Sequence, residues 1–365
     1  MTTLHLAGAG GNVPYYLREG LARDVRSVLE PHVGGGCFVV SDGNVGPLYG
    51  HEVAEQLDAP FLDLPAGEEH KNWESAERIV RWLLGWGVER RHALVAVGGG
   101  VVTDLVGFAA SVTLRGLPWV AVPTTLLAMV DAAVGGKTGI DLDLGKNLVG
   151  TFWPPTAVAA DPLVLRTLDS RQLRAGLVEV IKIGLIAPAT FEHVLDLHLR
   201  KVASGRIEGA TELIAAAVRI KAEVVSLDER EAGQRAALNL GHTLGHALEG
   251  ATGYRTFLHG EAVGWGVLAA LRLARDRGLL ATTSAQAWAT RLAMTVPWPP
   301  LAEISWQDVA PYLSRDKKRV SGRIGWVLPR VGGVILDVQV EVEEVEAIFR
   351  ELQSLSPIGP FTVLF

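Results

Sequence analysis

Short apolar runs alternate with segments of helical periodicity in the first half of the chain. Apolar residues fill positions 37–40, 93–97 and 119–122, and a Gly, Asp or Pro residue follows each run, after Ser41 in the first case. Between the first two runs, segment 75–84 repeats its apolar residues at helical spacing. Strands and helices that alternate in this way are typical of a parallel sheet covered by helices. The pattern therefore predicts an α/β fold for the first half.

The strand signals fade after about residue 168. Long periodic stretches then predict helices at 170–186, 208–227, 235–250 and 260–276, and a short hairpin is expected near 325–336. The second half is therefore predicted to be mainly α-helical. We place the domain boundary so that residues 1–165 form the α/β domain and residues 166–365 form the helical domain.

One of the predicted helices carries polar residues in an apolar segment. Arg235, Asn239, His242 and His246 follow one another at steps of four, three and four, which places them on one helical face. A buried polar group without a partner costs roughly 1–3 kcal/mol, and a charged group costs more. A metal ion and an anionic ligand would satisfy this face, and His259 follows thirteen residues after His246.

A second charged pair lies in an apolar helix. Glu179 and Lys182 are one turn apart, and a surface ion pair is the simplest interpretation of that spacing. The apolar surroundings favour a metal or a ligand instead, because buried charges need partners. One Glu and two His would form a three-ligand site with an open position, as in catalytic zinc sites. Spacing alone favours His242 and His246 as the pair and leaves open which His is not a ligand.

Two motifs in the first half are typical of nucleotide sites. Gly98, Gly99 and Gly100 follow a predicted strand and precede a predicted helix, where backbone N–H groups can approach a phosphate. A tight turn without a ligand fits this motif equally well. Asp42 follows an earlier strand and could accept hydrogen bonds from ribose hydroxyls, although an Asx turn is the commoner explanation.

A glycine-rich segment near residue 136 is not a Walker phosphate loop. That motif needs a Gly where this chain has Asp131. Lys137, Lys146 and Asn147 nevertheless lie close to glycines, which suits a phosphorylated ligand, although a solvated loop would show the same pattern.

Composition narrows the class of protein. The chain has 365 residues, enough for two cores, and a net charge of −6, which argues against nucleic-acid or anionic-membrane partners. Cys37 is the single cysteine, so neither an internal disulfide nor a cysteine zinc site is expected. The N-terminus lacks a signal-peptide pattern, and no apolar run reaches the length of a membrane span. We therefore expect a soluble, cytoplasmic protein.

An ordered set of segments resembles the 3-dehydroquinate synthase family of the sugar phosphate cyclase superfamily. The resemblance covers roughly residues 36 to 330 and lies in segments 67–71, 98–104, 115–116, 122–131, 135–139, 145–147, 175–182, 238–246, 258–262 and 316–318. It implies a homodimer with a Rossmann-like NAD-binding domain followed by a helical metal and substrate domain. The implied reaction converts 3-deoxy-D-arabino-heptulosonate 7-phosphate to 3-dehydroquinate and phosphate, by NAD-recycled oxidation, phosphate elimination, reduction and intramolecular aldol closure.

The resemblance also implies roles for individual residues. Zinc, with cobalt as the alternative, would bind Glu179, His242 and His259. The NAD site would be lined by Asp42, Asn44, Glu68, Lys71, Gly99, Gly100, Asp104, Thr124, Thr125, Leu127 and Lys146. The catalytic set would be His246, Lys137, Asn239, Arg235, Lys182, Lys221 and Asp131. The substrate would also contact Asn147, Lys318 and, from the partner subunit, Arg115.

The sequence also fits three alternatives. Sister cyclases act on sedoheptulose 7-phosphate, which has no carboxylate, whereas Arg235, Asn239 and His246 match the dehydroquinate pattern. A metal-dependent polyol dehydrogenase would not need Lys146 and Asn147, and an inactive sugar-phosphate sensor would not need the catalytic set. Thr103 and Asp141 depart from the family pattern, and neither the ten tryptophans nor the tail 341–365 is explained.

Overall fold

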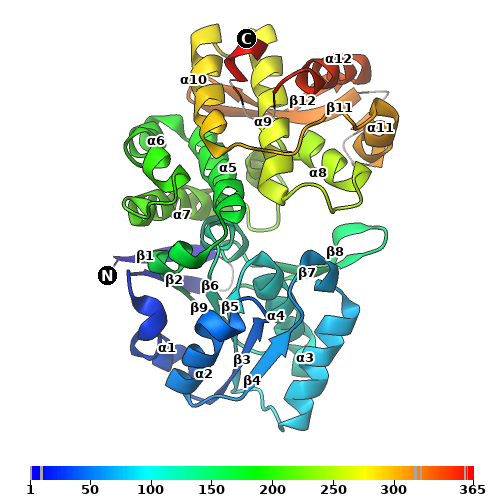
Figure 1. Cartoon of the computed structure of the whole chain (residues 1–365). Coiled ribbons are helices and arrows are strands. Elements are labelled where there is room, and N and C mark those ends of the chain that lie inside the picture. The colour runs from blue at the N-terminus through cyan, green and yellow to red at the C-terminus, as the bar shows by residue number, and fades with distance from the viewer. Residues whose placement is uncertain (1, 9–10, 316–318, 321–322, 357–358, 360) are drawn as a thin grey trace. The chain divides into compact units, whose positions relative to one another are not determined.

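The structure is a computed structural model that describes residues 2–8, 11–315, 319–320, 323–356, 359 and 361–365 (Figure 1). The chain forms two compact units. The first consists of Met1–Asp169 with Ala210–Arg230, and the second of Ser170–Gly209 with Glu231–Phe365. The sequence predicts one domain boundary, between residues 165 and 166. The two units differ from that prediction mainly in helix α7 (Ala210–Leu227). This helix packs on strand β1 and therefore belongs to the first unit.

A seven-stranded sheet with the order β1-β2-β9-β6-β5-β3-β4 forms the centre of the first unit. Only β1 and β2 pair antiparallel, and every other neighbouring pair is parallel. The strands are β1 (Thr2–Gly8), β2 (Gly11–Leu17), β3 (Cys37–Asp42), β4 (Phe61–Leu64), β5 (Ala93–Gly98), β6 (Trp119–Pro123) and β9 (Ala157–Ala160). The three predicted apolar runs are β3, β5 and β6, so the predicted parallel sheet is confirmed.

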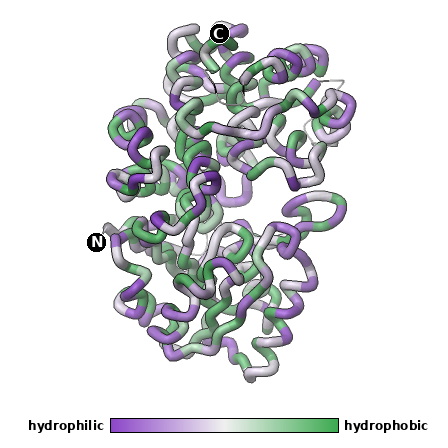
Figure 2. The backbone as a smooth tube through the Cα atoms, viewed as in Figure 1, coloured by the Kyte–Doolittle hydropathy of each residue, from purple (hydrophilic) through white to green (hydrophobic). Residues whose placement is uncertain are grey.

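Helices cover the sheet and a separate two-stranded hairpin extends from it. The helices are η1 (Leu21–Arg23), α1 (Arg26–Val33), η2 (Gly46–Gly50), α2 (His51–Leu57), η3 (Glu68–His70), α3 (Trp73–Gly85), α4 (Gly100–Val112), η4 (Thr113–Arg115), η5 (Ala128–Ala132), η6 (Pro162–Thr167) and α7. The hairpin is β7 (Lys137–Leu142) with β8 (Gly145–Phe152). All six residues of β5 are buried, which explains its continuous apolar sequence (Figure 2).

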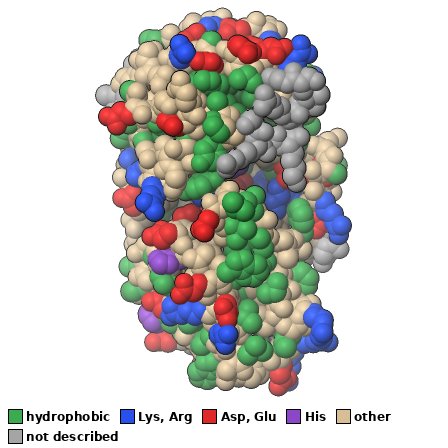
Figure 3. Space-filling model, turned by 90° about the vertical axis from the view of Figure 1, so that its right-hand side faces the viewer, with side chains coloured by type: hydrophobic (Ala, Val, Ile, Leu, Met, Phe, Trp, Pro, Cys, Tyr) green, Lys and Arg blue, Asp and Glu red, His purple; other side chains and the backbone are tan. Residues whose placement is uncertain are grey.

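The β7–β8 hairpin exposes large apolar side chains. Leu144, Leu148 and Phe152 are 79%, 59% and 44% exposed. The hairpin lies on the right in Figure 1 and faces the viewer in Figure 3, where apolar side chains gather over it. Exposed apolar patches of this kind are commonly interaction surfaces.

The second unit is built around α9, most of whose residues are buried. Its elements are α5 (Ser170–Ile186), α6 (Pro188–Ala203), η7 (Gln234–Asn239), α8 (His242–Ala251), α9 (His259–Asp276), α10 (Thr282–Leu292), η8 (Ala293–Thr295), α11 (Trp306–Arg315), β10 (Arg319–Val320), β11 (Arg323–Arg330), β12 (Gly333–Glu341), α12 (Val342–Gln353) and η9 (Phe361–Leu364). Helices α5, α8, α10 and α12 and strand β11 contact α9. The predicted mainly helical second half and its hairpin, β11–β12, are confirmed. No helix among the described residues has the length and apolar character needed to cross a membrane.

Several tryptophans and the tail belong to the core of this unit. Trp265 of α9 packs edge-on against Trp298, and Phe361 near the C-terminus stacks on Trp298 with ring centroids 5.0 Å apart. Trp306 of α11 contacts Phe349 of α12. The tail is therefore part of the packing around α9.

The prediction of one continuous helix over 235–250 is wrong. Residues Gln234–Asn239 form a 3-10 helix, and α8 begins only at His242. Gly241 separates the two with a left-handed φ of 79°. A Cβ at Gly266 of α9 would overlap the carbonyl oxygen of Gly241, so α9 approaches the backbone at this break. Arg235 and Asn239 therefore do not share a helical face with the histidines.

Candidate functional site

Three helices of the second unit bring together the predicted metal ligands. Glu179 lies on α5, His242 is the first residue of α8, and His259 is the first residue of α9. One ligand atom from each lies within 4.8 Å of the others. The second unit therefore contains a carboxylate and two imidazoles close enough to bind one metal ion.

The buried carboxylate of Glu179 is the clearest sign of a ligand site. Its side chain is 0% exposed, and neither oxygen accepts a hydrogen bond within the described chain. Lys182 forms an ion pair with Glu179, with Nζ 2.5 Å from Oε2. Oε1 lies 3.7 Å from Nε2 of His259. The ion pair expected from the spacing is present and buried, and the donor set fits a divalent metal at Oε1.

His242 presents one ring nitrogen for ligation. Its Nδ1 lies 3.1 Å from the carbonyl oxygen of Leu240, an acceptor, so Nδ1 carries the proton and Nε2 keeps its lone pair. Burial lowers the pKa of His242 well below its usual value, and the positive charge of Lys182 lowers it further. Neutral imidazole is the form that binds metal ions.

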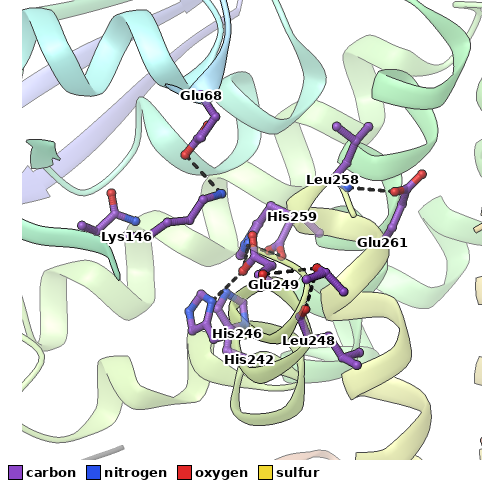
Figure 4. A network of polar contacts seen from close by, with 12 residues as sticks. Glu68, Lys146, His242, His246, Leu248, Glu249, Leu258, His259 and Glu261 are labelled. Carbon is purple, nitrogen blue, oxygen red and sulfur yellow. Dashed lines mark hydrogen bonds and ion pairs between the residues drawn. The ribbon is translucent and has the colours of Figure 1, made fainter. Parts of the chain in front are cut away.

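His246 differs from the other two histidines in exposure. Its side chain is 55% exposed, and Nδ1 lies 2.8 Å from Oε2 of Glu249, which is fully buried (Figure 4). The rings of His242 and His246 are 5.1 Å apart, and those of His246 and His259 are 5.6 Å apart. His246 therefore lies beside the ligand cluster with part of its ring open to small molecules.

The start of α9 is held by an ion pair whose carboxylate, that of Glu261, is buried. Glu261 accepts a hydrogen bond from the backbone N–H of Leu258 at 2.8 Å and pairs with the guanidinium of Arg171 at 2.6 Å. Arg171 also donates to the carbonyl oxygen of Thr256. Because His259 is the first residue of α9, these contacts fix its backbone.

The other predicted catalytic residues of the second unit are partly or fully buried. Arg235 is 2% exposed. Asn239 donates a hydrogen bond to Glu231 at 2.5 Å. Lys182 is 1% exposed and lies on α5 one turn after Glu179.

In the first unit, many predicted nucleotide residues lie at the carboxyl ends of β3, β5 and β6. Asp42 ends β3, Gly99 and Gly100 follow β5, and Thr124 and Thr125 follow β6. Ligands of open parallel sheets commonly bind at this edge.

Close packing joins these segments. The N–H of Thr124 donates to the carbonyl oxygen of Gly98 at 2.9 Å, and Thr124 Oγ1 is buried without a hydrogen-bond partner among the described residues. A Cβ at Gly99 would lie 3.0 Å from Thr125, and one at Gly100 would lie 3.8 Å from Leu127. Helix α4 starts at Gly100 without a side-chain cap, so its first N–H groups are suited to an anion.

The Asx turn expected as the simpler interpretation of Asp42 is present. Oδ1 of Asp42 accepts the N–H groups of Asn44 at 3.0 Å and Val45 at 2.9 Å. Asn44 is exposed.

Further predicted residues meet in one polar network. Lys71 pairs with Asp104 at 2.5 Å and donates to Asn147 at 2.6 Å, while Lys146 pairs with Glu68 at 3.1 Å (Figure 4). Burial acts to lower the pKa of Lys71, but nearby carboxylates outweigh it and raise that pKa. Burial acts to raise the pKa of Glu68, but Lys146 and Lys71 outweigh it and lower that pKa. Both groups are therefore held in their charged forms.

Asp141 belongs to the same network and was not assigned a role from sequence. Its Oδ1 accepts the N–H of Asn147 at 2.8 Å. Burial raises the pKa of Asp141 to about 6, although Lys71 acts in the opposite direction. Burial also raises the pKa of Asp104.

The remaining predicted residues of the first unit are distributed more widely. Lys221 of α7 donates to the side chain and the carbonyl oxygen of Asp131, at 2.5 and 2.6 Å. Lys137 begins β7 and is exposed, and Arg115 ends η4 with an exposed side chain and a φ of 67°. Lys318 lies outside the described residues.

Sequence reasoning missed Glu249, Glu261 and Arg171. A signal existed for Glu249, because it follows His246 by three residues and so shares its helical face. The contact between Arg171 and Glu261 joins positions 90 residues apart and leaves no local pattern.

Two family models match adjoining parts of the chain. The model for the 3-dehydroquinate synthase N-terminal region matches residues 61–175, and that for the C-terminal region matches residues 176–319. The chain belongs to the 3-dehydroquinate synthase family. It is therefore an enzyme of the lyase class. A 3-dehydroquinate synthase of Symbiobacterium thermophilum is 41% identical over 342 residues, which cover 91% of this chain and 95% of that protein.

Solved structures of other cyclases share the fold. A 2-deoxy-scyllo-inosose synthase, complexed with carbaglucose-6-phosphate, NAD+ and Co2+, has a TM-score of 0.88 at 28% identity and covers 96% of this chain and 100% of that chain. The 2-epi-5-epi-valiolone synthase of Streptomyces hygroscopicus subsp. jinggangensis 5008, with NAD+ and Zn2+ bound, has a TM-score of 0.83 at 29% identity. The match covers 95% of this chain and 98% of that chain. These similarities support NAD and a divalent metal as cofactors of this family member.

Proposed function

We propose that this chain is a 3-dehydroquinate synthase that converts 3-deoxy-D-arabino-heptulosonate 7-phosphate to 3-dehydroquinate and phosphate. The observation that carries the proposal is the buried carboxylate of Glu179, which accepts no hydrogen bond from the described residues and lies beside His242 and His259 in a chain of this family. Zinc is the proposed metal, and the cytoplasm is the proposed location.

NAD is assigned to the first unit. The supporting features are the uncapped start of α4, the glycines after β5 and the polar network around Lys71. The proposed NAD residues are Asp42, Asn44, Glu68, Lys71, Gly99, Gly100, Asp104, Thr124, Thr125, Leu127 and Lys146. Their backbone N–H groups suit the pyrophosphate, and their carboxylates suit ribose hydroxyls.

The metal is assigned to Glu179, His242 and His259. When bound, the metal and NAD+ would supply polarisation of a substrate hydroxyl and a reversible hydride acceptor. His246 would exchange protons with the substrate, because its ring is partly exposed beside the ligand cluster. The substrate's own phosphate can serve as the base for its elimination.

The substrate-binding residues are proposed to be Asp131, Lys137, Asn147, Lys182, Lys221, Arg235, Asn239 and Lys318, with Arg115 from the partner of a homodimer. Their cationic members would neutralise the carboxylate and phosphate of the substrate. The exposed apolar residues of the β7–β8 hairpin support a dimer, and Gly116, next to Arg115, lies against Trp153 just after β8.

A comparison of two substrates tests the proposed specificity. The purified enzyme, supplied with NAD+ and Zn2+, should release phosphate from 3-deoxy-D-arabino-heptulosonate 7-phosphate. Phosphate release from sedoheptulose 7-phosphate should be at least about 100-fold slower, because the cationic side chains that bind the carboxylate would have no carboxylate to pair with. Equal or inverted rates would instead identify a sister cyclase.

A further inference from the structure

A single buried carboxylate contacts two histidines. Glu249 of α8 is 0% exposed, and its Oε2 lies 2.8 Å from Nδ1 of His246 and 3.4 Å from Nδ1 of His259. Figure 4 shows the carboxylate between the two rings. Both contacts involve the same ring position, Nδ1.

That shared position determines where each ring carries its proton. An ionised carboxylate can only accept hydrogen bonds, so a neutral imidazole facing it has its N–H at Nδ1 and its lone pair at Nε2. One carboxylate oxygen has two lone pairs and can accept from both rings. Glu249 therefore favours the same tautomer in His246 and His259.

In this tautomer the lone pair of each ring is on Nε2, which suits one ring to bind a metal and the other to accept a proton. Nε2 of His259 faces Oε1 of Glu179 at 3.7 Å, the position for a shared metal. Nε2 of His246 belongs to a side chain that is 55% exposed, so it can take a proton from a bound molecule. His242 obtains the same tautomer differently, from the carbonyl oxygen of Leu240.

We propose that Glu249 is a positioning residue that sets the tautomers of His246 and His259 together, so that one offers Nε2 to the metal and the other offers Nε2 to the substrate. The roles of the two rings rest on the proposed function. The tautomers themselves follow from the contacts of Glu249. Partners of this kind typically change metal affinity about 10- to 100-fold when they are replaced.

Direct ligation is the competing explanation, because His246, Glu249 and His259 are also close enough to hold a metal. The two explanations differ in their consequences. A ligand Glu249 would make Glu249→Gln as damaging to metal binding as Glu179→Gln. A positioning Glu249 would leave the three ligands in place, so Glu249→Gln would be the milder change.

The test measures Co2+ affinity by chelator competition in the full-length, metal-free protein. Glu249→Gln should weaken Co2+ binding about 10- to 100-fold, and Glu179→Gln should weaken it more. Glu303→Gln removes an exposed carboxylate of the same unit and should stay within about twofold of the parent. Parental affinity in Glu249→Gln, or a loss equal to that of Glu179→Gln, would overturn the proposal.

A second measurement determines the tautomer of His246 directly and does not depend on metal binding. Long-range 1H–15N spectra of the metal-free parent should show His246, identified by its absence in His246→Ala, protonated at Nδ1. Protonation at Nε2 would overturn the proposal even if Glu249→Gln failed to fold. Neither measurement uses substrate. Absence of cyclase activity would refute the proposed function, whereas the Co2+ affinities and the spectra would still decide the role of Glu249.

Discussion

Gly260 of α9 lies directly against the carbonyl oxygen of Ala175 on α5, and a Cβ at Gly260 would overlap that oxygen. This close approach joins the helix that carries Glu179 to the helix that begins with His259. The metal ligands are therefore positioned by backbone packing as well as by their own side chains.

Gly260→Ala should separate these two helices. We expect the free energy of unfolding to fall by about 3 kcal/mol, because a backbone atom must move. Co2+ affinity should fall as well, since the ligands would move apart. Gly85→Ala, at the end of α3 where a Cβ meets nothing within 4 Å, is the control and should change stability by less than about 1 kcal/mol. Unchanged stability and metal affinity in Gly260→Ala would contradict the packing argument.

Metal binding should distinguish the ligands from His246. His246→Ala should abolish turnover and keep its zinc, so that chelation still lowers its melting temperature as in the parent. Glu179→Gln should bind little zinc and show no such shift. Metal analysis of both purified variants checks this, and loss of zinc from His246→Ala would refute the assignment of that residue.

Asp141 should make stability depend on pH in a defined window. Its pKa is raised from 3.8 to about 6, so the folded state favours the protonated form. The corresponding stabilisation is full below about pH 4 and is lost as the pH rises through about 6. Asp141→Asn should therefore gain stability relative to the parent between pH 4 and 7, by about 1 kcal/mol after allowance for partial exposure.

Urea unfolding at a series of pH values measures that gain. Asp143→Asn, in the same hairpin but exposed, is the control and should show no such trend. A difference between Asp141→Asn and the parent that stays constant or shrinks as the pH rises would contradict the assignment of the raised pKa.

A homodimer that shares Arg115 should allow complementation between inactive variants. Arg115→Ala and His246→Ala should each lose activity alone. Mixed dimers would have one intact site, so random mixing should restore about a quarter of parental activity. A mixture of His246→Ala with Glu179→Gln should stay inactive. Each subunit supplies both of these residues to its own site, so each site of a mixed dimer would lack one of them. No recovery in the first mixture would place Arg115 outside the partner's site.

The strands of the first unit that were predicted from sequence are buried along most of their length. Strands β3, β5 and β6 consist largely of apolar residues, whereas β8, which alternates exposed residues with partly buried ones, was not predicted. The break before α8 was missed because apolar periodicity does not reveal which glycine is left-handed. Gly241 has a positive φ, while Gly245, four residues later, lies within α8.

The candidate site could also be predicted from the sequence only in part. Polar residues in apolar segments pointed to Glu179 and the histidines as a metal site, but the choice of His242 and His259 as its two histidines came from the family resemblance. The supporting contacts of these residues could not be predicted, since the pairing of Arg171 with Glu261 depends on how α5 and α9 pack.

The most direct test of the proposed reaction is the amount of phosphate released per NAD+. The enzyme, zinc and NAD+ would be supplied far below the concentration of 3-deoxy-D-arabino-heptulosonate 7-phosphate. If the same NAD is reduced and reoxidised in each turnover, phosphate should exceed NAD+ many-fold without accumulation of NADH. Phosphate that stops at the amount of NAD+, or NADH that accumulates without phosphate, would contradict the account.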